Sequence, residues 1–261
     1  ENCVKEMAGQ DVKGKLKTAG VDKVASIKVK EKDSGNKIAV LYAEGEIRDD
    51  DSSSPFSADE QVISEEMANK LRKLKDDDDV KAVVFRVNSP GGSAYISEQI
   101  WKEVVELKAK KPIVVSMGNY AASGGYYISC AANKIVAERT TLTGSIGVFG
   151  VVRNFTGTFD KVGVTTDIVK TNTFADLGDI SRPMREDEKA LIQRGVEQTY
   201  DLFLTRCADG RGMTKAEIDS IGQGRVWTGE QALERGLVDQ LGGMDDAIKE
   251  AATLAELTDY S

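Results

Sequence analysis

Ser123 is the residue whose type and neighbours point most directly to chemistry. It lies in the stretch "GNYAASGGYYIS" (118–129), where small residues precede it and Gly124 and Gly125 follow it. This pattern predicts a turn from a strand into a helix that presents the serine hydroxyl. Such a hydroxyl is a nucleophile for acyl transfer when a base within hydrogen-bond reach accepts its proton. A Ser-Gly-Gly by itself is more typical of a tight structural turn, so other residues have to support the chemistry.

A base for this serine cannot be a histidine, because the 261 residues contain none. A Ser-His-Asp arrangement is therefore excluded, and the known substitute is a lysine whose pKa is lowered by burial. The three cysteines, Cys3, Cys130 and Cys207, are far apart and lack the spacing of metal ligands. We expect neither a metal nor a cofactor.

Glycine-rich segments follow three apparent strands, at 88–93 ("NSPGGS"), 119–126 ("NYAASGGY") and 141–150 ("TLTGSIGVFG"). In an open α/β sheet, sites lie beyond the carboxyl ends of the strands, so these segments should converge on one crevice. Phosphate is a poor ligand for it, because "PGGS" lacks the lysine of a P-loop and no G-x-G-x-x-G follows the first strand.

The same segments could stabilise an acyl-transfer intermediate. The N–H of Gly124 and an N–H from Gly91 or Gly92 could together form an oxyanion hole beside Ser123. One such donor typically lowers the barrier by roughly 3 kcal/mol.

The elements that position these segments alternate along the chain. Runs rich in Val and Ile alternate with amphipathic stretches, which indicates the α/β class with a mostly parallel sheet flanked by helices. We expect strands at 37–47, 80–87, 112–118, 134–138 and 162–170. We expect helices at 59–75, 97–110, 124–133 and 185–210, with shorter ones after residue 213 and a loop at 171–184.

Composition narrows the class of protein. Apolar residues make up 40% and charged residues 30%, as in ordinary soluble globular proteins. The net charge of −8 argues against nucleic acid as a partner, and no apolar run is long enough to cross a bilayer. Residues 1–36 are polar and rich in lysine, and we interpret them as a linker or the tail of a preceding half. Residues 37–261 are expected to form the catalytic domain.

Four segments in order resemble the signal peptide peptidase A family of serine proteases, relatives of the Clp protease and crotonase fold. They are "VVFRVNSPGGSAYISEQI", "SMGNYAASGGYYIS", "TTLTGSIGVFG" and "GRVWTGEQALERGLVDQLGG", and they lie within residues 37–250. The resemblance implies a ββα spiral of the Clp protease/crotonase type. It also implies that Ser123 is the nucleophile, that Gly91, Gly92 and Gly124 line the oxyanion hole, and that Ser145 orients a catalytic lysine.

The lysine itself departs from the family pattern. Short members carry it in a sequence like K-S-G-x-x-K-D, which aligns with "KTNTFADL" (170–177). Lys170 matches the first lysine and Asp176 the aspartate, so the catalytic position falls on Ala175. Lys170 is a weaker candidate for the base, because it belongs to the end of an expected strand.

Long members of the family have two similar halves, with the serine in the C-terminal half and the lysine in the N-terminal half. This chain resembles the C-terminal half, which predicts that the isolated chain has little or no peptidase activity. The resemblance implies cleavage of leftover signal peptides and short apolar segments at the cell membrane, on the periplasmic side of a bacterium. The implied partners are these peptides, the N-terminal half and further copies in a homotetramer.

Two other functions stay open. The chain could be a non-catalytic partner or scaffold domain, with Ser123 a remnant and Ala175 a mark of lost function. Crotonase-like acyl-CoA chemistry would use the same fold and oxyanion hole without a serine nucleophile.

Overall fold

The computed structural model of the chain describes residues 35–49 and 61–261. The expected linker therefore lies almost entirely outside the described residues, as does Cys3. None of the described helices is long and apolar enough to cross a bilayer.

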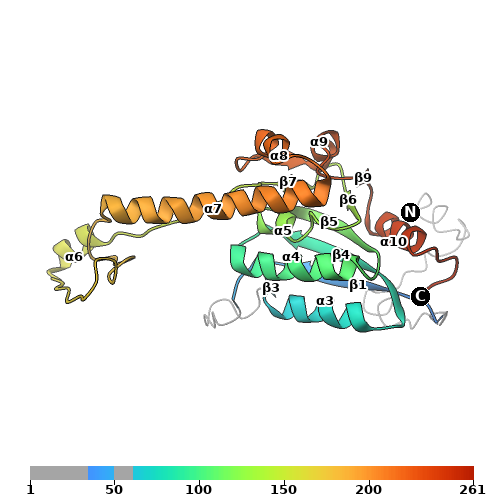
Figure 1. Cartoon of the computed structure of the whole chain (residues 1–261), viewed down its shortest axis with the longest axis horizontal. Coiled ribbons are helices and arrows are strands. Elements are labelled where there is room, and N and C mark those ends of the chain that lie inside the picture. The colour runs from blue at the N-terminus through green and yellow to red at the C-terminus, as the bar shows by residue number, and fades with distance from the viewer. Residues whose placement is uncertain (1–34, 50–60) are drawn as a thin grey trace, which may run out of the picture.

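A mostly parallel sheet forms the centre of the molecule, as the alternation of elements predicts (Figure 1). Its parallel strands follow the order β1 (Lys37–Glu44), β4 (Val80–Ser89), β5 (Ile113–Ala122), β6 (Lys134–Ala137) and β9 (Gln240–Leu241). Two further strands belong to this sheet. β7 (Leu142–Gly144) pairs in parallel with the end of β5 and antiparallel with β8 (Val226–Thr228). A separate pair of short parallel strands consists of β2 (Glu46–Ile47) and β3 (Val62–Ile63).

Helices cover both faces of this sheet. Their bounds are α3 (Glu66–Asp76), α4 (Ala94–Lys108), α5 (Gly124–Tyr127), α6 (Thr156–Val162), α7 (Glu186–Arg211), α8 (Lys215–Ile221), α9 (Gly229–Glu234) and α10 (Met244–Leu254). Val83 and Phe85 of β4 pack with α3, α4 and α5, whereas Ala82 and Val84 pack with α10. This alternation follows from the period of two in a strand, and it explains why β4 reads as a continuous apolar run.

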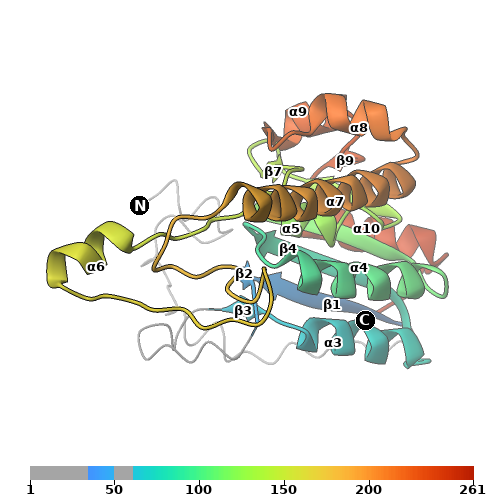
Figure 2. The same ribbon diagram turned by 60° about the vertical axis from the view of Figure 1, so that its left-hand side comes forward.

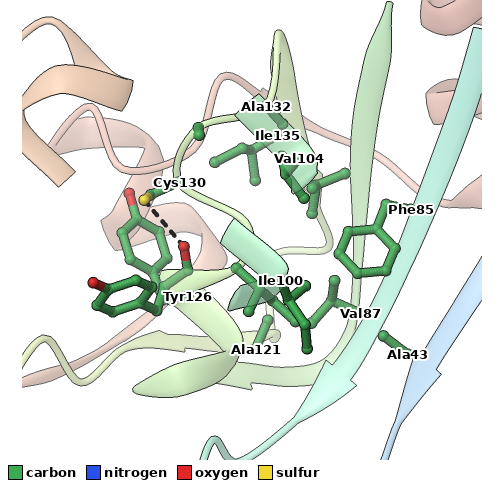
Figure 3. Packing of buried hydrophobic residues seen from close by; sticks show 14 of the residues in the cluster. Ala43, Phe85, Val87, Ile100, Val104, Ala121, Tyr126, Cys130, Ala132 and Ile135 are labelled. Atoms are coloured by element: carbon green, nitrogen blue, oxygen red, sulfur yellow. Dashed lines mark hydrogen bonds between the residues drawn. The ribbon is translucent and has the colours of Figure 1, made fainter. Parts of the chain in front are cut away.

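The larger core lies between β4, α4 and α5. Figure 3 shows Phe85 and Val87 facing Ile100 and Val104, with Tyr126 and Cys130 on the turn that carries Ser123. All six side chains are fully buried. The turn is thus built on the best-packed part of the molecule.

Three expected elements differ from the structure. The helix expected at 124–133 ends at Tyr127, and turns follow it. Val62 and Ile63 were expected in a helix over 59–75, but they form β3, and the helix begins at Glu66. Residues 162–170 were expected to be a strand, but they end α6 and then continue without regular structure. Among the described residues, no strand pairs with this stretch.

An arm, residues 149–199, projects from the sheet. It comprises α6, the loop after it and the first half of α7, which extend well away from the strands in Figure 1; α6 also stands clear of them in Figure 2. Glu188 is the one buried residue of the arm. The other described residues, 35–49, 61–148 and 200–261, form what we call the body.

Candidate active site

Ser123 occupies the junction between β5 and α5. Its backbone has φ 53° and ψ −119°, a conformation that side-chain-bearing residues rarely adopt. The Ser123 N–H donates to the Gly144 carbonyl at 2.9 Å, and the Ser123 carbonyl accepts from the Tyr127 N–H at 2.9 Å. The junction is therefore fixed on both sides, and the serine side chain lines a cleft. Strain of this kind is characteristic of functional sites.

The glycine pair beside Ser123 is required by close packing. Gly91 has φ 99°, and a Cβ on it would lie 2.5 Å from the Gly124 nitrogen. A Cβ on Gly92, at φ 145°, would lie 2.0 Å from the Ile47 carbonyl oxygen. The approach of the segments at 88–93 and 119–126 therefore depends on Gly91, and the approach of the 88–93 segment to β2 depends on Gly92.

Hydrogen bonding distinguishes the two glycines. The Gly91 N–H donates to the hydroxyl of Ser89 at 3.1 Å. The N–H groups of Gly92 and Gly124 have no acceptor among the residues that the structure describes. Gly92 and Gly124 thus offer available donors next to Ser123, while Gly91 shapes the turn.

Ser145 follows β7 and lines the same cleft. Pairing of Ala122 with Gly144 across β5 and β7 places Ser123 and Ser145 at adjacent strand ends. Ser145 also has a positive φ, 49°, and its N–H donates to the Arg225 carbonyl at 2.8 Å. Within 35–49 and 61–261, neither serine hydroxyl has a hydrogen-bond partner. Both are free to engage another group.

The cleft has a volume of about 940 Å³ and runs between the glycine-rich loops and α7. No Lys, Arg or His is among the described residues that line it, and its charged side chains are Glu46 and Glu197. The described part of the chain therefore brings neither a lysine nor a histidine into the cleft as a base for Ser123. The lining residues are Glu46, Pro90, Gly91, Gly92, Ala94, Ser97, Ser123, Gly124, Tyr127, Ser145, Gly147, Val148, Phe149, Gln193, Val196, Glu197, Thr199, Tyr200, Phe203, Gln223 and Gly224.

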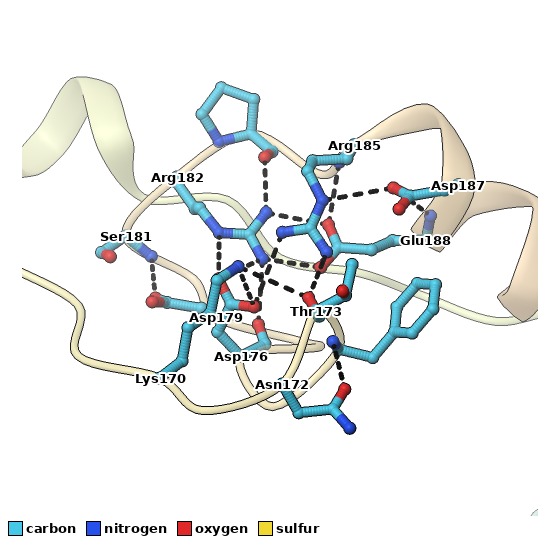
Figure 4. A network of polar contacts seen from close by, with 12 residues as sticks. Lys170, Asn172, Thr173, Asp176, Asp179, Ser181, Arg182, Arg185, Asp187 and Glu188 are labelled. Carbon is cyan, nitrogen blue, oxygen red and sulfur yellow. Dashed lines mark hydrogen bonds and ion pairs between the residues drawn. The ribbon is translucent and has the colours of Figure 1, made fainter.

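Lys170 lies in the arm, away from Ser123. Its ammonium pairs with Asp176 at 2.9 Å, and the neighbouring Ala175 is exposed. The same network reaches Glu188 at the start of α7 (Figure 4). Phe203, which packs beside the serine turn, is 15 residues further along α7, or about 22 Å at 1.5 Å per residue. The segment aligned with the short-form lysine is therefore not brought to Ser123 within this chain.

Charge pairing holds the arm segment together instead. Arg182 bridges Asp176 at 2.8 Å and Glu188 at 2.6 Å, and Arg185 contacts both carboxylates. The hydrogen bond from Lys170 and those from Arg182 hold the pKa of Asp176 far below its usual range. The hydrogen bonds from Arg182 lower the pKa of Glu188 to about 2. Both carboxylates are ionised at neutral pH, which suits a structural cluster rather than proton transfer.

Aromatic residues of the cleft were not singled out by the sequence. Tyr127 packs its ring on Phe203 at 4.6 Å, and its hydroxyl donates to Glu98 at 2.6 Å. Arg206 also donates to Glu98, at 2.5 Å, so α4, α5 and α7 are joined below the cleft. Burial raises the pKa of Tyr127, which keeps its hydroxyl protonated. The sequence placed Phe203 on the apolar stripe of the helix expected at 185–210, but it did not indicate that Phe203 packs on Tyr127 beside the cleft.

Metal binding finds no support in the arrangement of side chains. Within the described ranges, no group of three or more His, Cys, Asp or Glu residues is placed to hold a metal ion. Cys130 and Cys207 are both buried and free.

Comparisons with known proteins show the family of the chain. The family model described as Peptidase family S49 matches residues 105–258, more than half of the chain, and the Clp protease model matches residues 56–146. The second match confirms the expected Clp protease-like fold. "Protease 4" of Salmonella typhi is 44% identical over 87% of this chain, and "Serine protease SPPA, chloroplastic" of Arabidopsis thaliana is 35% identical over 97%.

The relatives differ in length. This chain covers 36% of the Salmonella protein and 38% of the Arabidopsis protein, so it spans a little over a third of these relatives. It covers 70% of a shorter protein of Enterococcus faecium named "Putative signal peptide peptidase SppA", at 38% identity over 92% of this chain. With the family model matching more than half of its residues, the chain belongs to peptidase family S49.

Proposed function

We propose that this chain carries the nucleophile and the oxyanion hole of a serine endopeptidase. The observation that carries the proposal is the cleft in which a strained Ser123 stands beside two N–H groups without acceptors, those of Gly92 and Gly124. A scaffold domain would have no need for this combination. Crotonase-like acyl-CoA chemistry would use the N–H groups but not the strained serine.

The reaction follows from these positions. The Ser123 oxygen attacks the peptide carbonyl while a base takes its proton, and the carbonyl oxygen becomes an oxyanion that accepts hydrogen bonds from Gly92 and Gly124. Each donor lowers the barrier by about 3 kcal/mol. The C–N bond then breaks, the amine leaves with the proton, and water releases the acyl group from Ser123.

The base is a lysine from outside the described cleft, supplied by an N-terminal half. Two observations support this: the described residues that line the cleft include no basic side chain, and the Salmonella relative is more than twice as long as this chain. Ser145, whose hydroxyl has no partner in the described ranges, orients the incoming lysine. The isolated chain has little activity because a serine without a base is a poor nucleophile.

The substrates are cleaved signal peptides and other short apolar segments. The cleft walls support this class, because Tyr127, Val148, Val196 and Phe203 offer apolar surface to an extended peptide. The name of the Enterococcus relative agrees with it. The enzyme works at the cell membrane, on the periplasmic side, as a homotetramer in which the exposed apolar residues of the arm become covered.

The test uses two proteins, the 261-residue chain and the full-length protein with its N-terminal half. The full-length protein should hydrolyse an apolar signal peptide and react with a fluorophosphonate at Ser123. Ser123→Ala should lower kcat by about 10⁴-fold or more, and the isolated chain should be inactive. Ser220→Ala, an exposed serine on α8, is the matched control and should change nothing.

Two results would contradict parts of the proposal. If the isolated chain hydrolyses peptides at a rate that Ser123→Ala removes, the base lies within the chain. If the full-length protein forms no adduct at Ser123, the chain is a scaffold domain.

A further inference from the structure

Strained backbone outside glycine is concentrated at the cleft. Among the described residues, four that are not glycine have a positive φ: Ser123, Ser145, Gln223 and Glu256. The first three line the cleft. Such strain persists only where the surrounding structure imposes it. Two of the three have roles in the proposed reaction, which leaves Gln223 and the contacts that impose its conformation to be explained.

Tyr200 makes the contact that fixes Gln223. Its hydroxyl accepts a hydrogen bond from the Gln223 N–H at 3.0 Å and donates one to the Asp219 carboxylate at 2.7 Å. Tyr200 lies on α7, Asp219 on α8, and Gln223 in the loop that leads from α8 to β8. A Cβ on Gly222 would lie 3.0 Å from the Tyr200 oxygen, so the loop passes close to the phenol.

The loop held by Tyr200 is in turn bonded to the Ser145 segment. Arg225 accepts a hydrogen bond from the Ser145 N–H at 2.8 Å, and the Gly224 N–H donates to the Ile146 carbonyl at 2.8 Å. A Cβ on Gly147 would lie 2.8 Å from the Cα of Gly224. These contacts leave Ser145 little freedom to move independently of residues 223–225.

We infer that Tyr200, oriented by Asp219, is a positioning residue that holds Ser145 in its strained conformation through the loop at 222–225. The inference rests on the proposed role of Ser145 in orienting the base. A hydroxyl is needed because the group must accept from one partner and donate to the other at the same time. Burial raises the pKa of Tyr200, so this hydroxyl stays protonated at neutral pH.

The contact between Tyr200 and the loop at 222–225 also lies at the junction of arm and body. It is the residue of α7 at which the arm joins the body, where its ring packs against the core. The orientation of Ser145 therefore depends on α7, the helix that leads into the arm.

The decisive experiment separates the hydroxyl from the ring. Tyr200→Phe keeps the packing and removes both hydrogen bonds, and it is compared with Ser145→Ala and the double variant in the full-length protein. We expect Tyr200→Phe to lower kcat about 10-fold with KM within twofold. It should also shift the pH profile of kcat in the same direction as Ser145→Ala. When Tyr200→Phe is added to Ser145→Ala, we expect kcat to fall by less than another factor of two, because the effects of coupled residues do not add.

Variants of Asp219 test whether an acceptor for the Tyr200 hydroxyl is enough to keep activity. A variant of Tyr42 is the control for removing a phenol hydroxyl elsewhere. Asp219→Asn retains an acceptor and should keep most of the activity, whereas Asp219→Leu should resemble Tyr200→Phe. Tyr42→Phe, at a phenol 57% exposed on β1, should behave as the unmodified protein. An equal loss from Tyr200→Phe in both backgrounds, or no loss in either, overturns the inference.

A second measurement is independent of catalysis. In the 261-residue chain, Tyr200→Phe should raise the hydrogen-exchange rates of the Ser145 and Gly224 amides at least 10-fold, with α4 unaffected. Unchanged exchange overturns the inference whatever the activity. Hydrolysis that survives Ser123→Ala contradicts the proposed function alone, so the two failures are distinguishable.

Discussion

The body and the arm are held together by different forces. In the body, Phe85 and Ile100 are fully buried, and the strands around them pack on both faces. In the arm, Phe149 is 86% exposed and Val169 is 96% exposed, while the one buried residue is the carboxylate of Glu188. The body is stabilised by its own apolar core. The arm is held by paired charges, and its apolar side chains are largely exposed.

The largest expected effect is on the free energy of unfolding, when one phenylalanine in the body and one in the arm are each replaced by alanine. Phe85→Ala leaves a cavity in the core and should lower the free energy of unfolding by about 3–5 kcal/mol. Phe149→Ala, the matched change in the arm, should lower it by less than about 0.5 kcal/mol. Urea unfolding of the 261-residue chain measures both. A loss above 2 kcal/mol for Phe149→Ala would mean that the arm is part of the core after all.

A smaller effect should appear as the pH falls. Asp176 and Glu188 have lower pKa values in the folded arm than in an unfolded chain, where carboxyl groups titrate near pH 4. Their pairing with Lys170, Arg182 and Arg185 therefore stabilises the arm fully above about pH 5, and this stabilisation is lost as the pH falls toward 2. Hydrogen exchange in peptides of the arm, corrected for intrinsic rates, should show protection falling over this range.

The same experiment compares the pH dependence of hydrogen exchange in the arm with that in the body. Peptides of β4 should keep their protection at pH values where the arm has lost its own. Glu188→Gln removes one of the titrating groups and should flatten the dependence. Simultaneous loss of protection in arm and body would show that the two regions unfold as one unit.

The smallest expected effect concerns Lys170. Because its ammonium pairs with Asp176 in the arm, Lys170→Ala should change kcat/KM of the full-length protein by less than about threefold. Lys189→Ala, which removes an exposed lysine at the start of α7, is the control. A loss of 10³-fold or more for Lys170→Ala alone would identify Lys170 as the base.

The sequence was most informative where burial alone decides the structure. The run at 80–87 lies within β4, and the run at 112–118 lies within β5 except for Pro112, because strands covered on both faces must be apolar throughout. The turn at Ser123 and the close approach of the glycine-rich segments were also predictable, since parallel strand ends meet at one edge.

The sequence was less informative where the structure of a segment depends on its contacts with a distant part of the chain. The two residues of β3 are a strand only because they pair with β2, a contact that no local pattern signals. Residues 162–170 have the composition of a strand, but no neighbouring strand is present to accept their hydrogen bonds. The choice between Gly91 and Gly92 as donor depended on the hydroxyl of Ser89. Tyr200 and Asp219 meet because α7 crosses α8, which neither helix reveals alone.

The length of α7 has a mechanical consequence. From Glu186 to Tyr200 the helix extends about 21 Å, and it carries no packed neighbours along most of this distance. A 2 Å displacement at the end of a 21 Å segment corresponds to a rotation of about 5° about its other end. At that other end, Tyr200 touches the loop behind Ser145. A rotation of this part of α7 about Tyr200 would therefore act on the loop that lines the cleft.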